Sequence, residues 1–444
     1  MSYKKLWWLD GESLDRLSLN GKSLEYDKKH NNDKDAYTMN HSLPIETSAT
    51  PASKQPVILQ IIPELSAGGA EQGCIDVANA IQSAGGQAIV SSNGGNRTHE
   101  ITRHNVIHID LPVHSKNPLI LWRNIGRIKK IIRQYDVDIV HVRSRAPAWS
   151  AYRACKKTPA RFMTTCHAPY NYHSKLKKFY NSAMAKGERV IAISEHVYEY
   201  LKSGYNAPEQ RLRLIHRGIP IEKFHPTVVS PERMITLNNN WRIPESAAVI
   251  LLPGRLTRWK GQKVLIEAMA QIQNKDVYAV LIGSDQGRTE YRKELEDLMN
   301  EKGLSAQVRI VDHCNDMPAA YMLSTVVVSA STDPEGFGRI PVEAQAMGRP
   351  IIGTDHGGAR ETILRGETGW LIPPNDPTAL AGAIKEALSL TNAQRAVLAT
   401  RAMTHVMQKF TKEIMTEKTL SVYAELLAEK NTPLSDTPPH SKIA

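Results

Sequence analysis

The stretch "AAVILLPGRLTRWKGQKVLIEAM", residues 247–269, decides the fold. Its first part is a continuous apolar run that ends in a glycine and a basic loop, and its last part reads as an amphipathic helix. Continuous apolar strands that alternate with helices are typical of parallel sheets covered on both faces. The stretch therefore predicts one strand–loop–helix unit of an α/β domain.

The same alternation runs through most of the chain, in two sets. The first set of strand-like runs comprises "VILQIIP", "QAIVS", "VIHI", "DIVHV", "RFMTT", "RVIAIS" and "RLRLI". The second comprises "AAVILLPG", "VYAVLIG", "QVRIV", "TVVVSA", "RPIIGT" and "GWLIP". A chain of 444 residues also exceeds one ordinary core. We therefore expect two doubly wound, Rossmann-like domains, with a cleft where the carboxyl ends of their strands face each other.

Changes in composition suggest where the domains begin and end. Residues 1–55 are polar and without periodicity, which predicts a flexible extension. The remaining divisions that we expect are an N-terminal domain over 56–225, a linker over 226–247, a C-terminal domain over 248–410, a helix over 411–429 and a disordered tail over 430–444.

Charge is distributed unevenly along the chain. The formal net charge is +11, but residues 101–225 hold 23 Lys and Arg against 8 Asp and Glu, which amounts to +15. A basic half attracts nucleic acid, an anionic membrane surface or a phosphorylated substrate. Composition alone does not choose among these partners.

Cysteine usage and hydropathy predict a cytoplasmic protein. The four cysteines are scattered, without the spacing of a metal site or a disulfide framework, and read as reduced thiols. No apolar run approaches the ~20 residues that are needed to span a bilayer.

Two loops that follow predicted strands have the composition of anion sites. In "PELSAGGAEQG", Gly68 and Gly69 stand where a strand turns into a helix, and helix N-terminal amides favour anions. The spacing is not G-x-G-x-x-G, which disfavours a nicotinamide cofactor, and a simple tight turn is the alternative. In "PGRLTRWKG", Arg255 and Lys260 flank a strand-to-helix crossover and suit a diphosphate, although a solvated basic loop has the same composition.

A third loop carries two acids. In "DPEGFGRIPVEAQAMG", residues 333–348, Glu335 and Glu343 stand on either side of a Gly-Phe-Gly turn. We expect Pro341 to be the first helical residue, so that Glu343 lies in the first turn, where the helix dipole favours its ionised form. Glu343 could be an ordinary first-turn acid, whereas Glu335 beside the glycines fits the binding of sugar hydroxyls.

Taken together, these motifs resemble those of glycosyltransferase family 4. The resemblance rests on Glu-x7-Glu in "EGFGRIPVE", with "GRLTRWKG", "GGAE", "IAISE" and "DHGGARETI…GETGWLIPPND" in the same order, over residues 56–429. It implies a retaining enzyme that uses a nucleotide sugar and has the GT-B fold, in which two Rossmann-like domains face a cleft. We accordingly expect the helix over 411–429 to cross back to the N-terminal domain.

The resemblance implies a role for each matching residue of the C-terminal domain. Glu343 would bind the ribose of the nucleotide, and Glu335 would hold hydroxyls of the donor sugar. Arg255 and Lys260 would neutralise the leaving diphosphate. Backbone amides of the Gly-Phe-Gly turn would contact the donor sugar and phosphate, and the base would lie near the loop that follows "VRIV". The residues of these last two sites are Gly336, Phe337, Gly338, Val311 and His313.

In the N-terminal domain the resemblance implies two further site residues. Gly69 would approach the donor phosphate from across the cleft. His167, in "TTCHAP", would lie near the transferred sugar and act in catalysis, although a histidine after a strand is often a structural hydrogen-bonding group. Two positions depart from the family pattern: "RGIP" at residues 217–220 replaces the usual "NGID", and Arg339 stands where an aliphatic residue is commoner. Both could adapt the cleft to an anionic ligand or be neutral.

The reaction that we expect is hexose transfer from a nucleotide-diphosphate sugar to an acceptor hydroxyl, without a cofactor. No Asp-x-Asp motif accompanies the cations, so this interpretation requires no metal. The basic, partly aromatic stretches at residues 117–135 and 171–187 suggest association with the anionic inner leaflet and a lipid-linked or lipopolysaccharide-type acceptor in envelope synthesis. A solvated basic face is an equal reading of residues 117–135.

Two other interpretations remain. One is another GT-B enzyme, such as a nucleotide-sugar epimerase or a phosphorylase, against which the Glu335–Glu343 pair and "GRLTRWKG" argue. The other is a non-catalytic protein that binds a nucleotide or RNA. We do not expect nucleic acid as a partner, because the basic half has no recognition motif and no aromatic stacking platform.

Overall fold

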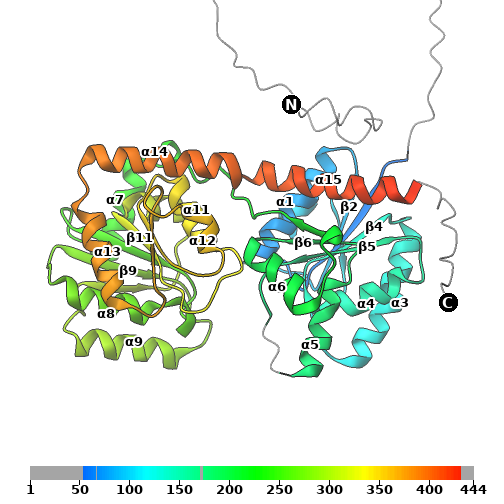
Figure 1. Ribbon diagram of the computed structural model, residues 1–444, viewed down its shortest axis with the longest axis horizontal. Coiled ribbons are helices and arrows are strands. Elements are labelled where there is room, and N and C mark those ends of the chain that lie inside the picture. The colour runs from blue at the N-terminus through cyan, green and yellow to red at the C-terminus, as the bar shows by residue number, and fades with distance from the viewer. Residues whose placement is uncertain (1–53, 67, 171–173, 432–444) are drawn as a thin grey trace, which may run out of the picture.

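A computed structural model describes residues 54–66, 68–170 and 174–431. The predictions for residues 1–53 and 432–444 lie outside this part of the chain. Figure 1 shows two α/β domains side by side, joined across one side by a long pair of helices. Both sheets are parallel and have helices on their faces, which confirms the predicted pair of Rossmann-like domains.

The N-terminal domain is built on a seven-stranded sheet of order β3-β2-β1-β4-β5-β6-β7. All neighbouring strands pair in parallel. Its strands are β1 (Val57–Ile61), β2 (Gln87–Ser92), β3 (Ile107–Asp110), β4 (Ile139–Val142), β5 (Arg161–Cys166), β6 (Arg189–Ala192) and β7 (Leu212–Leu214). Its helices are α1 (Gly69–Ser83), α2 (Thr98–Thr102), α3 (Pro118–Gln134), α4 (Arg145–Cys155), α5 (Lys175–Asn181) and α6 (Glu195–Tyr205), with short 3-10 turns η2 (Ser182–Ala185) and η3 (Glu209–Arg211).

The C-terminal domain is built on a six-stranded parallel sheet of order β10-β9-β8-β11-β12-β13. Its strands are β8 (Ala248–Pro253), β9 (Val277–Ile282), β10 (Val308–Val311), β11 (Val326–Ser329), β12 (Ile351–Thr354) and β13 (Trp370–Ile372). Its helices are α8 (Gln262–Ile272), α9 (Thr289–Glu301), α10 (Met317–Leu323), α11 (Arg339–Ala346), α12 (Ala359–Thr362), α13 (Pro377–Ser389) and α14 (Asn392–Lys409), with the 3-10 turn η5 (Arg258–Lys260). In each sheet the strand order reverses at its middle, β1/β4 and β8/β11, which is where α/β folds bind ligands.

The segment at residues 226–247, interpreted from the sequence as a linker, contains a helix. After the 3-10 turn η4 (Pro226–Val228), α7 (Pro231–Trp241) begins with a proline in its first turn and is followed by Arg242, whose φ is 53°. Trp241 is buried, and α7 packs against α10 of the C-terminal domain. The helix was not predicted because most of its residues are polar. Only Trp241 is buried, so the segment lacks the repeated apolar positions that indicate a helix.

The chain returns to the N-terminal domain at its C-terminal end, as expected. Helix α14 ends at Lys409, and α15 (Lys412–Asn431) then packs against α1, where Met415, Leu420 and Tyr423 join the core of the N-terminal domain. The Tyr423 hydroxyl lies 2.7 Å from Nδ1 of His141 on β4. Figure 1 shows α15 lying over this domain. Within the described residues, no helix is both long enough and apolar enough to cross a bilayer.

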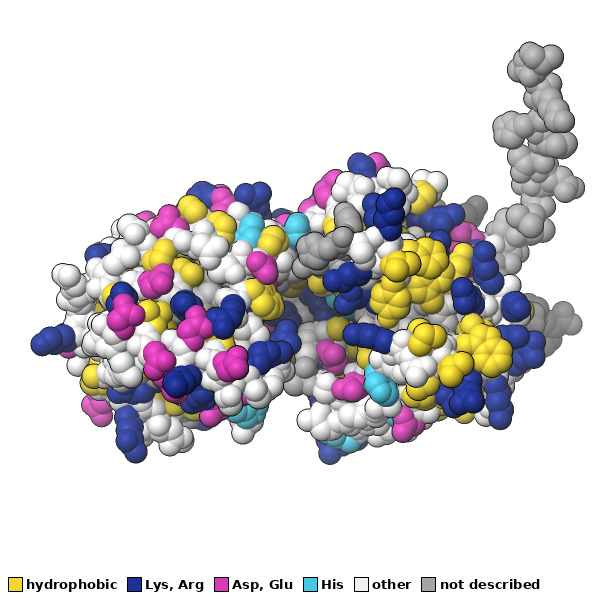
Figure 2. All heavy atoms as spheres, turned by 90° about the horizontal axis from the view of Figure 1, so that it is seen from below, with side chains coloured by type: hydrophobic (Ala, Val, Ile, Leu, Met, Phe, Trp, Pro, Cys, Tyr) yellow, Lys and Arg dark blue, Asp and Glu magenta, His cyan; other side chains and the backbone are white. Residues whose placement is uncertain are grey.

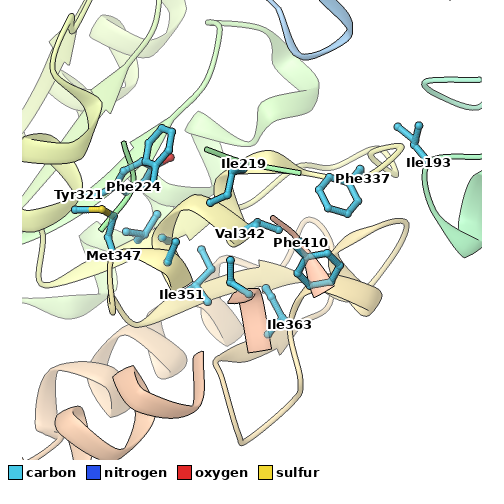
Figure 3. Close-up of a cluster of buried hydrophobic side chains, with 14 of the residues drawn as sticks. Ile193, Ile219, Phe224, Tyr321, Phe337, Val342, Met347, Ile351, Ile363 and Phe410 are labelled. Carbon is cyan, nitrogen blue, oxygen red and sulfur yellow. The ribbon is translucent and has the colours of Figure 1, made fainter. Parts of the chain in front are cut away.

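An aromatic cluster supports the loop that contains the Gly-Phe-Gly turn. Phe337 is 3% exposed, and its ring centroid lies 5.6 Å from that of Phe410, at the end of α14. Figure 3 shows the rings of Phe337 and Phe410 close to Val342 of α11, with Ile219 on the other side of Phe337 from the end of the loop. The side chain of Phe337 is thereby anchored in the core, and the turn is held at the edge of the sheet that faces the other domain.

Candidate active site in the interdomain cleft

A cleft of about 1020 Å³ lies between the two domains, at the carboxyl ends of both sheets. Figure 2 shows the molecule hollowed between the domains. Most of the residues implied by the family resemblance line this cleft: Gly69, His167, Arg255, Lys260, Glu335, Gly336, Phe337 and Gly338. Residues far apart in the sequence are therefore brought to one place by the ends of β1, β5, β8 and β11.

The basic loop after β8 places two cations in the cleft wall, one exposed and one buried. Arg255 is exposed, and its carbonyl accepts a hydrogen bond of 3.0 Å from Gln262 Nε2. Lys260 ends η5 just before α8, and its side chain is 11% exposed. Gly261 has a φ of 75°, and a Cβ there would lie 1.9 Å from the Ala330 carbonyl oxygen. Glycine is required at this position, because only it lets the loop approach β11 and bring Lys260 into the cleft.

Lys260 is paired with one of the two predicted acids. Its Nζ lies 2.7 Å from Oε1 of Glu335, which also accepts a hydrogen bond of 2.5 Å from the Ser331 hydroxyl. The Glu335 side chain is 18% exposed. The pair places a positive and a negative group side by side, and each can exchange its partner for a group of an incoming anionic sugar derivative.

The start of helix α11 differs from the sequence prediction. The helix begins at Arg339, with Gly338 at a φ of 81° as its N-cap, so Pro341 is not the first helical residue and Glu343 does not lie in the first turn. The prediction was wrong because Gly338 turns the chain earlier than expected, and proline is tolerated within a first turn, whose N–H groups have no intrahelical partner. Glu343 instead makes two specific side-chain contacts.

Those contacts are an arginine and a tyrosine. Oε1 of Glu343 lies 2.9 Å from Nη2 of Arg339, and its Oε2 accepts a hydrogen bond of 2.8 Å from the Tyr321 hydroxyl. The Tyr321 ring is fully buried, and burial, followed by the nearby Glu343 carboxylate, raises the pKa of this phenol well above its ordinary value. Tyr321 therefore remains a hydrogen-bond donor to Glu343. Arg339, one of the two departures from the family pattern, is thus an ion-pair partner of Glu343.

The Gly-Phe-Gly turn touches the opposite domain. A Cβ on Gly336 would lie 2.5 Å from the carbonyl oxygen of His167, and one on Gly358 would lie 2.4 Å from Cα of Phe337. Both positions require glycine because the backbone segments approach so closely. With the Phe337 side chain in the core, only backbone groups of this turn face the cleft.

His167 directly follows β5, and its ring has no hydrogen-bond partner among the described residues, although both nitrogens are buried. This differs from the structural role considered above, in which the ring would be hydrogen-bonded. Burial, and then the positive charges of Arg217 and Arg143, hold the pKa of His167 well below its ordinary value. The imidazole is therefore neutral, with one nitrogen able to donate a hydrogen bond and the other able to accept one.

The two residues assigned to the nucleotide base lie outside the cleft wall. Val311 ends β10, and the exposed His313 follows on the loop, with Nε2 2.6 Å from Oδ1 of Asn315. Glu343 also is not among the residues that line the cleft itself. All three nevertheless belong to elements at the carboxyl edge of the same sheet.

Sequence reasoning missed two features of the site. Arg143 follows β4 directly, and is 4% exposed; the rule that side chains after parallel strands meet at one edge would have found it. Glu361 of α12 accepts hydrogen bonds from the amides of Glu195 (2.7 Å) and His196 (3.0 Å), at the start of α6, and lies 2.9 Å from Nε2 of His216. Glu361 therefore ties the C-terminal domain to the N-terminal domain.

The site as a whole is suited to an anion with hydroxyl groups. Its walls present guanidinium, ammonium and carboxylate groups, a neutral imidazole and glycine-rich backbone. Within the described residues, no group of three or more His, Cys, Asp and Glu side chains is arranged to hold a metal ion.

Comparison with known proteins agrees with this geometry. Residues 235–403 match the family described as Glycosyl transferases group 1, and residues 67–223 match Glycosyltransferase Family 4. The putative glycosyltransferase EpsD of Bacillus subtilis is 30% identical over 271 residues, which span 59% of this chain and 70% of that protein. The D-inositol 3-phosphate glycosyltransferase of Corynebacterium urealyticum is 31% identical over 51% of this chain and 54% of its own length.

Solved structures with the same fold include a glycosyltransferase from Rickettsia africae. It is 36% identical, with a TM-score of 0.79 over 85% of this chain and all of that one. The HepE protein of Anabaena, solved in complex with UDP, has a TM-score of 0.73 and 22% identity over 84% of this chain and all of that one, which is a likeness of fold.

Proposed function

The chain belongs to glycosyltransferase family 4, and from this premise we propose that it transfers a hexose from a nucleotide-diphosphate sugar to an acceptor hydroxyl with retention of configuration. The observation that carries the proposal is the pair of Lys260 and Glu335 in the cleft wall, beside Arg255. A cation for the leaving diphosphate and an acid for sugar hydroxyls then stand next to each other. The HepE structures contain UDP and UDP-glucose, which supports this class of donor.

In the proposed reaction the bond between the anomeric carbon and the diphosphate oxygen breaks, and a bond to the acceptor oxygen forms on the same face. The proton of the acceptor hydroxyl passes to the departing phosphate oxygen. Arg255 and Lys260 stabilise the negative charge that develops on the diphosphate. Lys260 does so by moving from Glu335 to the phosphate, which frees Glu335 to accept hydrogen bonds from the sugar. No metal and no cofactor takes part.

The neutral ring of His167 would contribute near the transferred sugar. Both nitrogens are buried and lack a partner among the described residues, so a sugar hydroxyl can satisfy them without breaking an existing hydrogen bond. Glu343 would bind the ribose of the nucleotide, and the base would lie toward Val311 and His313. Gly69 would allow the donor phosphate to approach the start of α1.

The test is consumption of nucleotide sugars from a mixed pool with a glycolipid extract as acceptor, followed by mass spectrometry. Wild-type protein should deplete one nucleotide sugar and release its nucleoside diphosphate. Lys260→Ala should lose this activity, and Lys293→Ala, which removes an exposed lysine of α9, should keep it. NMR of the product should show the anomeric configuration of the donor; an inverted product, or an unchanged pool, would reject the proposal.

We further propose that the acceptor is lipid-linked or of lipopolysaccharide type, and that the protein works at the cytoplasmic face of the membrane. Figure 2 shows hydrophobic side chains gathered among Lys and Arg on the N-terminal domain. Four exposed apolar side chains of α3 and α5 support this proposal. They are Leu119 (68% exposed), Trp122 (70%), Leu176 (83%) and Phe179 (61%). Phe179 stacks on Trp149 of α4 at 4.8 Å between ring centroids.

Basic residues surround this apolar patch. Arg123, Lys175 and Lys177 are exposed beside it, so its charge and its hydrophobicity both fit an anionic leaflet. Within the basic stretch at residues 171–187, of which the structure describes 174–187, helix α5 is followed by the 3-10 turn η2. Flotation with anionic vesicles at low salt should recover the wild-type protein, and Trp122→Ser with Leu176→Ser should abolish recovery. Val397→Ser, an exposed apolar residue of α14, is the matched control, and failure of the wild type to float would reject membrane association.

A further inference from the structure

Three arginines from distant parts of the chain meet at the start of α1. Arg217 follows β7, Arg339 begins α11 of the other domain, and both line the cleft. A Cβ on Gly69 would lie 3.2 Å from Nη2 of Arg217 and 3.3 Å from Cδ of Arg339. Arg143 lies behind them, since a Cβ on Gly73 would lie 2.6 Å from Nη1 of Arg217 and 3.8 Å from Nη1 of Arg143. The two departures from the family pattern are thus neighbours in space.

The donors of these guanidinium groups are poorly satisfied. Arg217 is 6% exposed, and its side chain makes no hydrogen bond or ion pair within the described residues. Nε of Arg143 donates to Oε1 of Gln60 at 2.7 Å, but its buried Nη2 has no partner in the part of the chain that the structure describes. Nε of Arg339 is likewise buried without one. The buried Nη2 of Arg143 and Nε of Arg339 cost free energy until a ligand accepts hydrogen bonds from them.

The acids near the cluster do not balance it. Glu343 is paired with Arg339, and Asp76 of α1 accepts a hydrogen bond of 2.8 Å from Gln72 instead of from an arginine. Burial raises the pKa of Asp76, and its carboxyl group interacts with Arg217 only through space. Glu71, in the first turn of α1, attracts Arg217 only through space. Burial, and then Arg339 and Arg143, lower the pKa of Arg217 to about 9, so it remains charged at neutral pH without a bound partner.

We propose that Arg217 and Arg339 bind an acidic group of the acceptor, a phosphate or a carboxylate, beside the site of transfer. The planar forks of two arginines can hold either oxyanion through paired hydrogen bonds. Arg143 adds positive potential behind the bound group. This proposal rests on the proposed transferase function, and it goes further by defining the acceptor as anionic close to the hydroxyl that receives the sugar.

Charge matching assigns this site to the acceptor instead of the donor. A diphosphate ester within a nucleotide sugar carries two negative charges, and Arg255 and Lys260 already supply two positive ones on the C-terminal domain. Arg217 and Arg143 belong to the N-terminal domain, where the acceptor would bind. Packing against Gly69 and Gly73 also limits the positions that Arg217 can take, so the fork is held in place before the acceptor arrives.

The first experiment is a thermal-shift titration with inorganic phosphate at saturating UDP, or whichever of UDP, GDP and ADP stabilises the wild type. We expect a further, saturable rise in Tm with phosphate, because the two anion sites are separate. Arg217→Gln should weaken phosphate binding at least tenfold and leave nucleotide binding within twofold. Arg211→Gln, which removes an exposed arginine of η3, is the matched control and should behave as the wild type.

Three results of this titration would overturn the proposal. The first is that phosphate has no effect on the wild type, and the second is that Arg217→Gln binds phosphate as well as the wild type. The third is that nucleotide abolishes the phosphate effect, which would assign the arginines to the donor. Nucleotide binding by Arg217→Gln shows that the variant is folded. If no nucleoside diphosphate stabilises the wild type, the proposed function fails, and the phosphate titration without nucleotide still decides the arginine site.

A second arm distinguishes the two acidic groups. Glucose 6-phosphate and glucuronate are titrated in the same assay, with glucose as the neutral control. Stabilisation by glucose 6-phosphate alone indicates a phosphorylated acceptor, and stabilisation by glucuronate indicates a carboxylated one. In either case Arg217→Gln should lose the effect, and an effect of glucose equal to that of the acidic sugars would overturn the proposal.

Discussion

The two faces of the cleft hold their buried charges in different ways. On the C-terminal domain two cations of the cleft have acid partners: the buried Lys260 lies 2.7 Å from Glu335, and the partly exposed Arg339 lies 2.9 Å from Glu343. On the N-terminal domain, the buried Arg217 forms no ion pair with an acid among the described residues. A paired face is stable when empty and must exchange partners when a ligand binds. An unpaired face is strained when empty and gains stability from an anion.

The largest expected effect comes from breaking a pair on the C-terminal face. Lys260→Ala removes the charge that would stabilise the leaving diphosphate, and should lower kcat about 10²- to 10³-fold, as loss of one preorganised stabilising group does. Steady-state kinetics against Lys293→Ala measure the effect. Because Glu335 would be left partly buried and unpaired, Lys260→Ala should also lower Tm, and Lys260→Met with Glu335→Gln should recover Tm without recovering kcat. A variant that keeps half of its wild-type kcat would refute the assigned role.

Substitution of the two acids of the C-terminal face should affect different steps, nucleotide binding for Glu343 and sugar transfer for Glu335. Glu343→Gln loses charge-assisted hydrogen bonds to the nucleotide, which are each worth about 1.5–3 kcal/mol, so the nucleoside diphosphate Kd should rise about tenfold or more. Glu335→Gln should leave that Kd within about threefold and lower kcat instead, because its contacts are to the sugar that moves. Calorimetry for Kd and initial rates for kcat separate the two. The reverse pattern would exchange the roles of the acids.

The fold was predictable because its signals are local. Each apolar run is one buried strand, as in β8, and the glycine and basic residues after it mark the strand end that faces the cleft. Arg255, Lys260 and His167 were singled out in this way, and all three line the cleft. The start of α11 was mispredicted because Pro341 is a strong helix-start signal, whereas the positive φ of Gly338 determines where the helix begins.

The charge pairing was not predictable, because it depends on how the two domains face each other. Arg217 and Arg339 appear in the sequence as unrelated departures from a pattern, and only the interdomain packing brings both to Gly69. The same holds for Glu361, whose partners at the start of α6 belong to the other sheet. Sequence periodicity describes one element and its own sheet, so contacts between sheets escape it.

The contacts by which Glu361 joins the two domains should weaken at low pH. Burial would raise the pKa of Glu361, but the hydrogen bonds from His216 and the amides of His196 and Glu195 outweigh it, and the pKa is lowered from 4.5. A lowered pKa means that the carboxylate adds stability above about pH 4.5, and that this stability is lost as the pH falls through the folded-state pKa. Glu361→Gln should cost about 1–3 kcal/mol at pH 7.

The measurement is chemical denaturation from pH 7 to pH 3. The difference in unfolding free energy between wild type and Glu361→Gln should shrink below about pH 4.5, since the wild-type carboxyl is then protonated too. Glu367→Gln, an exposed acid of the next loop, controls for general acid effects. A difference that stays constant with pH would mean that the charge of Glu361 does not link the domains.

The smallest expected effect is also the most direct comparison of the faces, because the same substitution should have opposite signs on them. Arg217→Gln removes a buried charge that has no partner among the described residues, so in buffer without phosphate it should stabilise the protein by about 1 kcal/mol, as substitutions that relieve a strained functional site commonly do. Arg339→Gln leaves Glu343, 12% exposed, without its cation and should lower Tm. Calorimetric scans of both variants at pH 7 decide the matter. A fall in Tm for both would mean that the arginines of the two faces serve the same structural role, and that the unpaired face is not held ready for an anion.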